Sequence, residues 1–483
     1  MKGEEQQVRT GPDVYPMTAE QEAIWLDDHL RDGESRYIES WVYRLEGALD
    51  RGAAHWALER IVARHEGLRS RFSLDEDRLL QRVLPEKHGL ELEAVSCTAS
   101  SLDDTLKDLV SRPMDVAESP IRATLVEVAQ DTTVLVVQLH HLVVDGWALQ
   151  TLEREFEEHY RAYVERRPVA VAPVELQPGA HALAEQSARR DPSVRAYWRE
   201  NLRGLSSDVA NTLAIDDTVA PACAGGEHSD RGERITFEVD ADTARRVRAV
   251  CRRLRVTPFA VFASIVSVLL HSAGRAQDVI VGTPVSHRDS ASHDQVMAPM
   301  TGLLPLRMTV DADASFAELV AHVRTRGHEA ITYKDISYGE LVGMTRRRGQ
   351  AGGRGMVRTV LVVEDAHPSR MRLPGLKAQR IYVHSGVSKF DLCFTLVAQD
   401  RDYRGFLDYA VDLFPAGVVE QVTDDFMALL YRACDNPDGT VTWLVDGIGE
   451  GRAGASGTPR RRSSAKALPS EVVSSVDRVR QGG

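Results

Sequence analysis

The feature that most constrains the fold is the apolar run TTVLVVQL at 132–139, followed directly by the segment HHLVVDG at 140–146. An unbroken run of β-branched and other apolar residues is typical of a strand buried on both faces. After Gly146 the apolar residues recur three or four positions apart up to Tyr163, which predicts an amphipathic helix. The sequence therefore predicts a tight strand-to-helix connection that holds an imidazole rigidly at the rim of a core.

Length and composition indicate a globular protein with two domains. The chain has 483 residues, which is too long for one ordinary hydrophobic core. Its 43% hydrophobic and 27% charged content is that of a soluble globular protein. The formal net charge of −12 argues against a general nucleic-acid binder. Two basic runs, 346–348 and 460–462, are expected to be solvated loop charges.

The sequence offers no targeting segment and no cluster with metal-ligand spacing. Residues 1–10 lack the apolar core of a signal peptide, and the longest apolar run, 259–270, is too short to cross a bilayer. Thr257 and Pro258 are typical of an N-cap and a first helical residue, so we expect this run to form a buried helix. The five cysteines are odd in number and show no CxxC spacing. These features favour a cytoplasmic protein without a metal site.

Strands and helices alternate in two groups, separated by a bridging stretch at 168–190. This mixture predicts an α/β protein with two layered units, each a sheet covered by helices. The expected helices are 18–31, 50–65, 147–165, 241–254, 257–273 and 315–331, and the expected strands are 37–46, 71–84, 121–139, 235–239, 278–285, 357–364 and 391–399. The chain then divides into an N-terminal tail at 1–14, a first half at 15–185, a second half at 186–450 and a disordered tail at 451–483.

The segment HHLVVDG resembles the HHxxxDG signature of the condensation-domain superfamily, which includes chloramphenicol acetyltransferase-like enzymes and the condensation domains of nonribosomal peptide synthetases. Other segments between residue 17 and about residue 435 resemble the family's motifs in the same order. They are MTAEQEAIWL (17–26), ARHEGLRSRF (63–72), RAYWRENL (195–202), VIVGTPVSHRD (279–289), LLPLR (303–307), YKDISYGELV (333–342), SKFDL (388–392) and LDYAVDLF (407–414). So many ordered matches make the resemblance specific.

The resemblance implies a fold and an activity. Both halves would adopt the chloramphenicol acetyltransferase-like fold and form a V-shaped pseudo-dimer, with the active site in the cleft between them. The enzyme would join an aminoacyl or acyl thioester on a peptidyl carrier protein to an amine or alcohol, which is either a small molecule or carrier-bound. It would need no metal and no dissociable cofactor, because the phosphopantetheine arm belongs to the carrier. We expect a free-standing, monomeric enzyme, since no segment resembles an adenylation domain or a carrier attachment site.

Within the signature, the resemblance assigns the role of base to His141. Forming an amide or ester from a thioester requires an amine or alcohol that loses a proton during or after attack. An unperturbed imidazole has a pKa near 6.5, so it can be neutral and basic at cytoplasmic pH. Whether His141 acts as a full base or mainly orients the nucleophile is left open by the sequence. His140 should point the opposite way along the strand, and we expect it to brace the loop.

The remaining site residues have supporting roles. Asp145 is expected to cap the following helix and to pair with Arg288, its partner by resemblance to the family. Gly146 is expected to allow a backbone conformation that a side chain would hinder and to let a substrate approach. Trp147 is expected to pack, and Arg64 is expected to stabilise the core of the first half.

Two departures from the family pattern fall in the second half. Gly302 and Leu303 stand before LPLR where the family usually has asparagine and threonine, and His287 replaces an asparagine before Arg288. These changes put an ordinary carrier-bound amino-acid acceptor in doubt and favour a free small molecule, with a lean toward a hydroxyl.

Three alternatives remain beside the condensation enzyme. A CoA-dependent acyltransferase shares HHxxxDG, but the chain has no DFGWG segment. An epimerase relative carries the same histidines with other motifs in its second half. A non-catalytic module that binds a partner enzyme usually has a damaged signature, and here the signature is intact.

Overall fold

The computed structural model describes residues 13–29, 36–86, 89–187, 191–205, 213, 230–274, 276–345, 356–364 and 371–454. Both basic runs, Cys223 and most of the two predicted tails lie outside the described residues. Of the tail predicted from residue 451, positions 451–454 continue a helix that begins at Val441.

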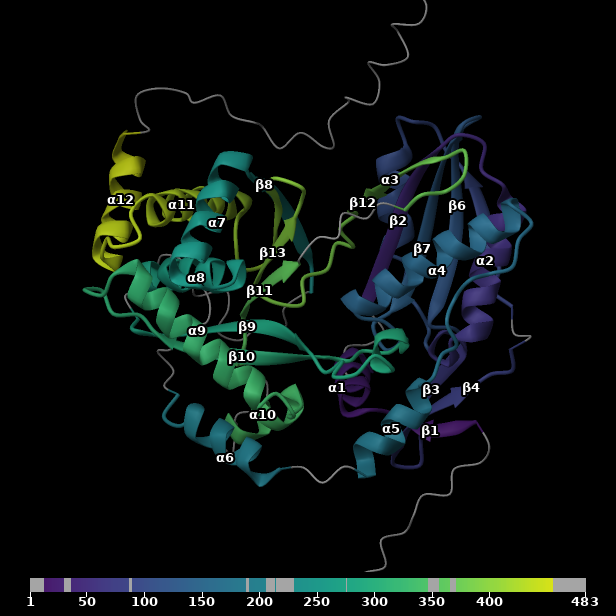
Figure 1. The fold of residues 1–483 in the computed structure, drawn as a ribbon, viewed down its shortest axis with the longest axis horizontal. Coiled ribbons are helices and arrows are strands. Elements are labelled where there is room, and N and C mark those ends of the chain that lie inside the picture. The colour runs from purple at the N-terminus through teal and green to yellow at the C-terminus, as the bar shows by residue number, and fades with distance from the viewer. Residues whose placement is uncertain are drawn as a thin grey trace, which may run out of the picture.

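The first half is built on a five-stranded sheet with the strand order β12-β2-β7-β6-β5 (Figure 1). Helices α2 and α4 cover one face of this sheet, and α3 covers the other. A three-stranded sheet, β1-β4-β3, lies beside them. The elements of this half are β1 (Val14–Pro16), α1 (Ala19–His29), β2 (Ile38–Glu46), α2 (Arg51–Arg64), β3 (Ser70–Asp75), β4 (Arg78–Val83), β5 (Leu92–Ser96), α3 (Leu102–Val110), β6 (Ile121–Ala129), β7 (Thr132–His140), α4 (Gly146–Val164) and α5 (Pro178–Ser187). The next helix, α6 (Pro192–Asn201), packs in the core of the second half through Val194 and Trp198.

Strand β7 lies in the middle of this sheet because its side chains are apolar on both faces. Leu135, Val137 and Leu139 join the core under α2 and α4, whereas Val134 and Val136 face α3. Every residue from Val134 to the end of the strand is buried. The strand predicted from TTVLVVQL, with burial on both faces, is therefore confirmed.

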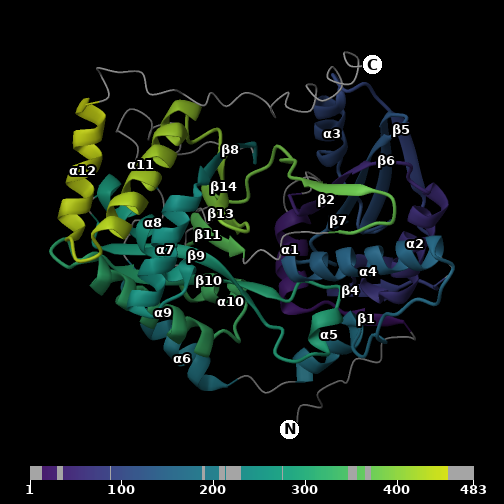
Figure 2. The ribbon, with the colours of Figure 1, turned by 45° about the horizontal axis from the view of Figure 1, so that its top comes forward.

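The second half contains a six-stranded sheet with the order β10-β9-β11-β13-β14-β8. Helices α7, α8, α9 and α11 pack on one face, and in Figures 1 and 2 the sheet lies between these helices and the first half. The elements are β8 (Gly232–Val239), α7 (Ala241–Leu254), α8 (Pro258–Gly274), β9 (Asp278–Ser286), β10 (Thr301–Thr309), α9 (Phe316–Thr332), α10 (Tyr338–Thr345), β11 (Thr359–Glu364), β12 (Lys377–Ile381), β13 (Leu392–Ala398), β14 (Tyr403–Ala410), α11 (Ala416–Asp435) and α12 (Val441–Gly454).

The apolar run 259–270 forms the buried helix α8, as predicted. Val261, Phe262, Ile265 and Val266 are fully buried in the core of the second half. Within the described residues, no single helix is long and apolar enough to span a membrane, although α7 and α8 pass by length and composition as a pair bent by 105°.

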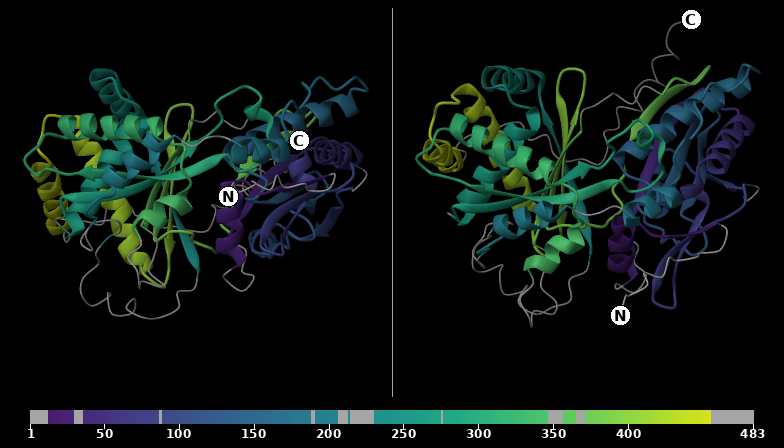
Figure 3. Two further views of the ribbon diagram at one scale, coloured as in Figure 1. Left: turned by 90° about the horizontal axis from the view of Figure 1, so that it is seen from below. Right: turned by 60° about the horizontal axis from the view of Figure 1, so that its bottom comes forward.

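Two segments of the second half cross into the first half. Strand β12 pairs antiparallel with β2 and forms the edge of the first-half sheet, with Lys377 opposite Glu46. The β9–β10 connection also reaches across, as both views in Figure 3 show, and it places Met297 in the core of the first half. The division of the chain at residues 185 and 186 stays a prediction, and β12 makes the five-stranded sheet a product of both halves, whereas all six strands of the other sheet come from the second half.

Gly67 marks the tightest of these contacts. A Cβ atom built on Gly67 would lie 2.1 Å from the main-chain oxygen of Met297, and a backbone oxygen cannot rotate away as a side chain can. We therefore predict that Gly67→Ala lowers the free energy of unfolding by about 1–3 kcal/mol, measured by urea denaturation.

The control for this prediction is Gly327→Ala in α9. A Cβ atom there meets nothing within 4 Å, so the change should leave stability unchanged or raise it by up to about 1 kcal/mol. Equal urea midpoints for Gly67→Ala and the native chain would contradict the prediction, because they would show that the contact between the halves rearranges around the added methyl group at no cost in stability.

Candidate functional site

The segment 140–146 connects the end of β7 to the start of α4 at the junction of the two halves. The main-chain N–H of His141 donates to the carbonyl of Tyr37 at 2.6 Å, which continues the β2–β7 pairing one residue beyond the strands. This hydrogen bond fixes the backbone that carries the imidazole. The His141 side chain is 24% exposed, so it is held by the core and remains accessible.

His140 braces the connection, as expected. It is fully buried, and its Nε2 lies 3.2 Å from Oδ2 of Asp28 in α1. Its Nδ1 accepts a hydrogen bond from the N–H of Leu142 at 3.2 Å. Both ring nitrogens are therefore engaged in holding α1 and the loop together, and neither is free to exchange a proton with a substrate.

His141 has one ring nitrogen that is available for chemistry. Its buried Nδ1 lies against the main-chain carbonyl of the same residue without good hydrogen-bond geometry, whereas Nε2 lies 3.7 Å from Oε1 of Glu39. Burial lowers the pKa of His141, and the nearby ammonium of Lys389 lowers it further. The carboxylates of Glu39 and Asp145 act in the opposite direction but do not reverse the shift. The imidazole is therefore neutral, and able to accept a proton, at neutral pH.

Asp145 joins α4 to the second half through a fully occupied carboxylate. Oδ1 accepts hydrogen bonds from the N–H of Ala148 at 2.8 Å and from Nη2 of Arg288 at 2.9 Å. Oδ2 accepts from the N–H of Met300 and the hydroxyl of Thr301, both at 3.0 Å. Asp145 is thus the helix cap and arginine partner that the sequence analysis expected. With both oxygens engaged, it is poorly placed to take a proton from a substrate.

Arg288 is held by the loop that it helps to order. Its guanidinium donates to the carbonyls of His293, Val296 and Ala298 in addition to Asp145. The side chains of Arg288 and Asp145 are 2% and 1% exposed, so the ion pair is removed from water. The folded protein is strongly destabilised when one partner of a buried ion pair such as this is removed.

Two expectations about the residues after Asp145 are wrong. Gly146 is the first residue of α4, and its φ is not in the left-handed region that favours glycine. The cap at Asp145 makes the turn, so Gly146 needs no special backbone freedom. A Cβ at Gly146 would meet nothing within 4 Å, which leaves open space beside the site. Trp147 does not pack, because its side chain is 44% exposed at the first turn of α4.

Arg64 supports the first half at a place separate from the histidine segment. Its Nε donates to Oε1 of Glu155 at 3.1 Å, and its guanidinium also donates to the carbonyl of Ala172. Glu155 accepts from His65 as well, at 2.9 Å. These contacts tie α2 to α4 and to the bridging segment, which agrees with the expected role in the first half.

Sequence reasoning missed Glu39 and Lys389, the charged residues nearest to His141. Lys389 Nζ lies 3.2 Å from Oε1 of Glu39. Glu39 is placed by the β2–β7 register, in which Ile38 faces His140 and Glu39 faces Leu139, so that Glu39 and His141 are diagonal neighbours. Only the strand register could have revealed this proximity, and a single sequence does not give that register.

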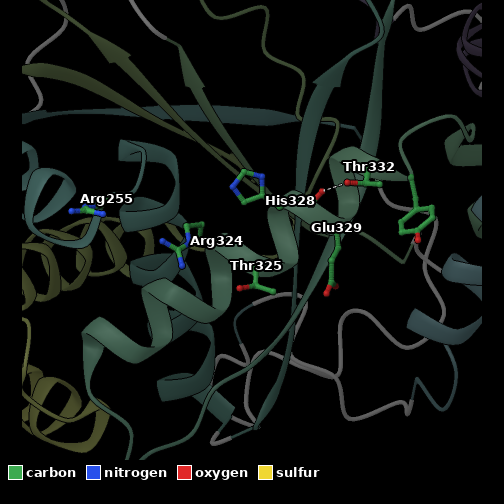
Figure 4. A pocket seen from close by; sticks show the side chains of 7 residues that line it. Arg255, Arg324, Thr325, His328, Glu329 and Thr332 are labelled. Atoms are coloured by element: carbon green, nitrogen blue, oxygen red, sulfur yellow. Dashed lines mark hydrogen bonds between the residues drawn. The ribbon is translucent and has the colours of Figure 1, made fainter.

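A pocket of about 630 Å³ lies elsewhere, against the C-terminal part of α9 (Figure 4). Arg255, Arg324 and His328 line it together with Glu329. None of its lining residues belongs to the histidine segment, so this pocket does not define the chemistry described above. Within the described part of the chain, no three His, Cys, Asp or Glu side chains are grouped to hold a metal ion.

We predict that Asp145→Ala and Arg288→Met each lower the free energy of unfolding by about 3–5 kcal/mol, because each leaves a buried charge without its partner. The double variant should lose less than the sum of the two, since it removes both charges. Urea denaturation of the four proteins measures this coupling.

An exposed ion pair provides the control for the buried one. Arg203→Ala breaks the pair with Glu200, in which both side chains are mostly exposed, and should change stability by less than about 1 kcal/mol. Strictly additive losses at Asp145 and Arg288 would contradict the buried-pair interpretation.

Comparison with known proteins identifies the fold and the family. The family model described as "Condensation domain" matches residues 12–445. The chain is 29% identical over 444 residues to a probable nonribosomal peptide synthetase, CymA, of Salinispora arenicola, and 28% identical over 444 residues to a dimodular nonribosomal peptide synthase of Bacillus subtilis. The matches cover 88% of this chain but only 6% and 18% of those proteins.

Solved structures show the same architecture. The X-domain from teicoplanin biosynthesis matches with a TM-score of 0.78 at 23% identity, over 90% of this chain and 98% of that one. SgcC5 from Streptomyces globisporus matches with a TM-score of 0.73 at 22% identity, over 88% of this chain and 100% of that one. These likenesses confirm the predicted α/β fold with two chloramphenicol acetyltransferase-like halves. With a family model that spans nearly its whole length, the chain belongs to the condensation domain family of nonribosomal peptide synthesis.

Proposed function

We propose that this protein transfers an aminoacyl or acyl group from a thioester on a separate peptidyl carrier protein to an amine or alcohol. The observation that carries the proposal is the placement of His141, whose main-chain N–H is fixed by the carbonyl of Tyr37 and whose side chain is 24% exposed, while burial lowers its pKa. A general base requires such a rigid, neutral imidazole.

The proposed reaction breaks one bond and forms another at the thioester carbonyl. The nitrogen or oxygen of the acceptor attacks the carbon, and its proton passes to Nε2 of His141. The carbon–sulfur bond then breaks, and the proton passes to the sulfur of the carrier's pantetheine thiol. Asp145 and His140 hold the loop during these steps.

The acceptor side supports a small molecule as the nucleophile. A Cβ at Gly302 would lie 3.0 Å from Cε1 of His287 and 3.3 Å from Oε1 of Glu20, so the two departures from the family pattern form one local change. His287 is itself placed by the carbonyl of Lys334, 3.1 Å from its Nε2. Burial, together with Glu185, raises the pKa of Glu20 to about 7. Glu20 is therefore only partly ionised at neutral pH, and we take this reduced charge beside Gly302 and His287 as support for an uncharged hydroxyl or amine as the acceptor.

A second candidate function is recruitment of a partner protein. The X-domain that resembles this chain in fold has been solved in complex with OxyB. Against this candidate stand the accessible Nε2 of His141 and the intact arrangement of Asp145 and Arg288, which a binding surface does not require. The experiment below separates the two.

We predict a His141-dependent product when carrier protein charged with a panel of acyl and aminoacyl groups is mixed with pooled amines and alcohols. The pool includes aryl 1,2-diols, because SgcC5 was solved with 1-(2-naphthyl)-1,2-ethanediol. His141→Ala should lower kcat/KM by about 10²–10⁴-fold, since a positioned base contributes that much. Mass spectrometry detects the product and distinguishes amide from ester.

Acyl-CoA donors and a distant histidine variant serve as controls. His328→Ala changes a residue on the outer side of α9 and should leave turnover unchanged. Product from acyl-CoA alone would make the protein a soluble acyltransferase instead. No product from any donor, combined with stable capture of a partner, would favour recruitment.

The pKa of His141 gives a prediction for pH dependence. Because burial and Lys389 lower this pKa, the base stays unprotonated to lower pH than an ordinary histidine. The acid limb of kcat/KM, where activity falls as the base is protonated, should therefore have its midpoint below about 6.5. A midpoint at or above about 7 would contradict the assignment of His141 as a base with a lowered pKa.

A further inference from the structure

A cross-half ion pair lies directly beside the proposed base. Lys389 Nζ, from the second half, lies 3.2 Å from Oε1 of Glu39 in β2, and the same oxygen lies 3.7 Å from Nε2 of His141. The ammonium of Lys389 also lies 4.9 Å from the centre of the Tyr37 ring. Glu39 and Lys389 are 36% and 27% exposed, so both border solvent-accessible space at the junction.

The position of Lys389 is fixed by contacts that do not involve Glu39. Arg36, next to the start of β2, donates to the carbonyls of Ser388 and Lys389 at 3.4 and 3.0 Å. The same guanidinium pairs with Asp230 at 3.2 Å. Arg36 thus anchors the backbone at Lys389, and this anchoring holds the ammonium of Lys389 next to Glu39.

The 3.7 Å separation between Glu39 and His141 suits a contact that forms during the reaction. It is too long for a hydrogen bond, and a neutral imidazole with an unprotonated Nε2 has no proton to offer the carboxylate. Once Nε2 carries a proton, the imidazolium and the carboxylate attract each other and can close to a charge-assisted hydrogen bond. Lys389 prepares this acceptor, because it holds the pKa of Glu39 below its usual range against the opposing effect of burial.

Other charged groups near His141 are already committed. Asp145 is occupied by Arg288 and by main-chain and hydroxyl donors, and Asp28 is engaged by His140. Arg234 in β8 acts on Glu39 from a distance but is paired with Asp408 at 2.8 Å. Tyr37 presents its ring edge-on to His141, at 6.3 Å between centroids. Among the described residues Glu39 is held by Lys389 alone, so it is the carboxylate that can turn toward His141 when the imidazole becomes charged.

We propose that Glu39 is a positioning residue that receives the Nε2–H of His141 during acyl transfer, and that Lys389 restrains this carboxylate between turnovers. The inference rests on the proposed function. The acceptor's proton moves to Nε2 and later to the leaving thiol, while Glu39 remains a carboxylate throughout. The base and its carboxylate both belong to the first half, and the second half supplies the ammonium that restrains the carboxylate.

The test titrates His141 in the full chain by following its ring proton Hε1 with NMR in ¹³C-labelled protein. The spectrum of His141→Ala identifies the signal. Glu39→Gln removes the stabilising carboxylate and should move the titration midpoint of His141 down by about 0.2–0.7 pH unit. Lys389→Met removes a repelling charge and releases Glu39, so it should move the midpoint up by a similar amount.

Opposite signs show that both charges act on the imidazole, and the loss of kcat described below separates a positioning role from proximity alone. Shifts of the same sign, or no shifts, would overturn the proposal. Lys377→Met provides the matched control, because it breaks a pair with Glu46 that joins the same two segments of chain, and it should leave the midpoint unchanged. Lys389→Arg keeps the charge and should restore the native midpoint if Lys389→Met perturbs folding.

Kinetics completes the test once a substrate pair is identified. Glu39→Gln should lower kcat about tenfold with little change in KM, as expected for the loss of a hydrogen bond to a charged group. An unchanged kcat would overturn the proposal. The titration requires no substrate, so a failed product screen would overturn the proposed function without affecting the NMR result.

Discussion

The carboxylate of Asp145 is the interaction on which the arrangement of the site depends. It caps α4 and accepts the guanidinium of Arg288, and it also accepts donors from Met300 and Thr301 at the start of β10. This ion pair is almost completely buried. It therefore fixes how the two halves meet and where the second half lies relative to His141. The aspartate of the signature thus acts through geometry, whereas the histidine four residues earlier supplies the reactive nitrogen.

The junction owes its rigidity to exchanged segments as well as to this ion pair. Strand β12 completes the sheet that carries His141, and Met297 fills the core beneath α4. Lys389 follows β12 along the chain and is anchored by Arg36 of the first half. The first half therefore contains a strand and a core residue of the second half, and the surroundings of the imidazole are built from both halves.

Local pattern in the sequence predicted the parts of the fold that depend on burial. The run at 132–139 and the run at 259–270 were assigned to a strand and a helix because their apolar character allows little else. Strand pairing between residues far apart in the sequence has no local pattern of this kind. The edge strand β12 and the position of Glu39 diagonal to His141 could therefore not be predicted from the sequence. Trp147 was expected to pack because it is large and apolar, but the first turn of α4 projects it outward.

The exchange of β12 also bears on how the chain reaches its folded state. The strand it pairs with, β2, is made early in synthesis, whereas β12 begins only at Lys377. Until then the first-half sheet has an open edge at β2, and an exposed edge is a template for wrong pairing. Contacts of such long sequence separation form slowly. The first half therefore cannot complete its sheet until the second half has been synthesised. An isolated N-terminal fragment would keep the open edge at β2 and would be prone to aggregate.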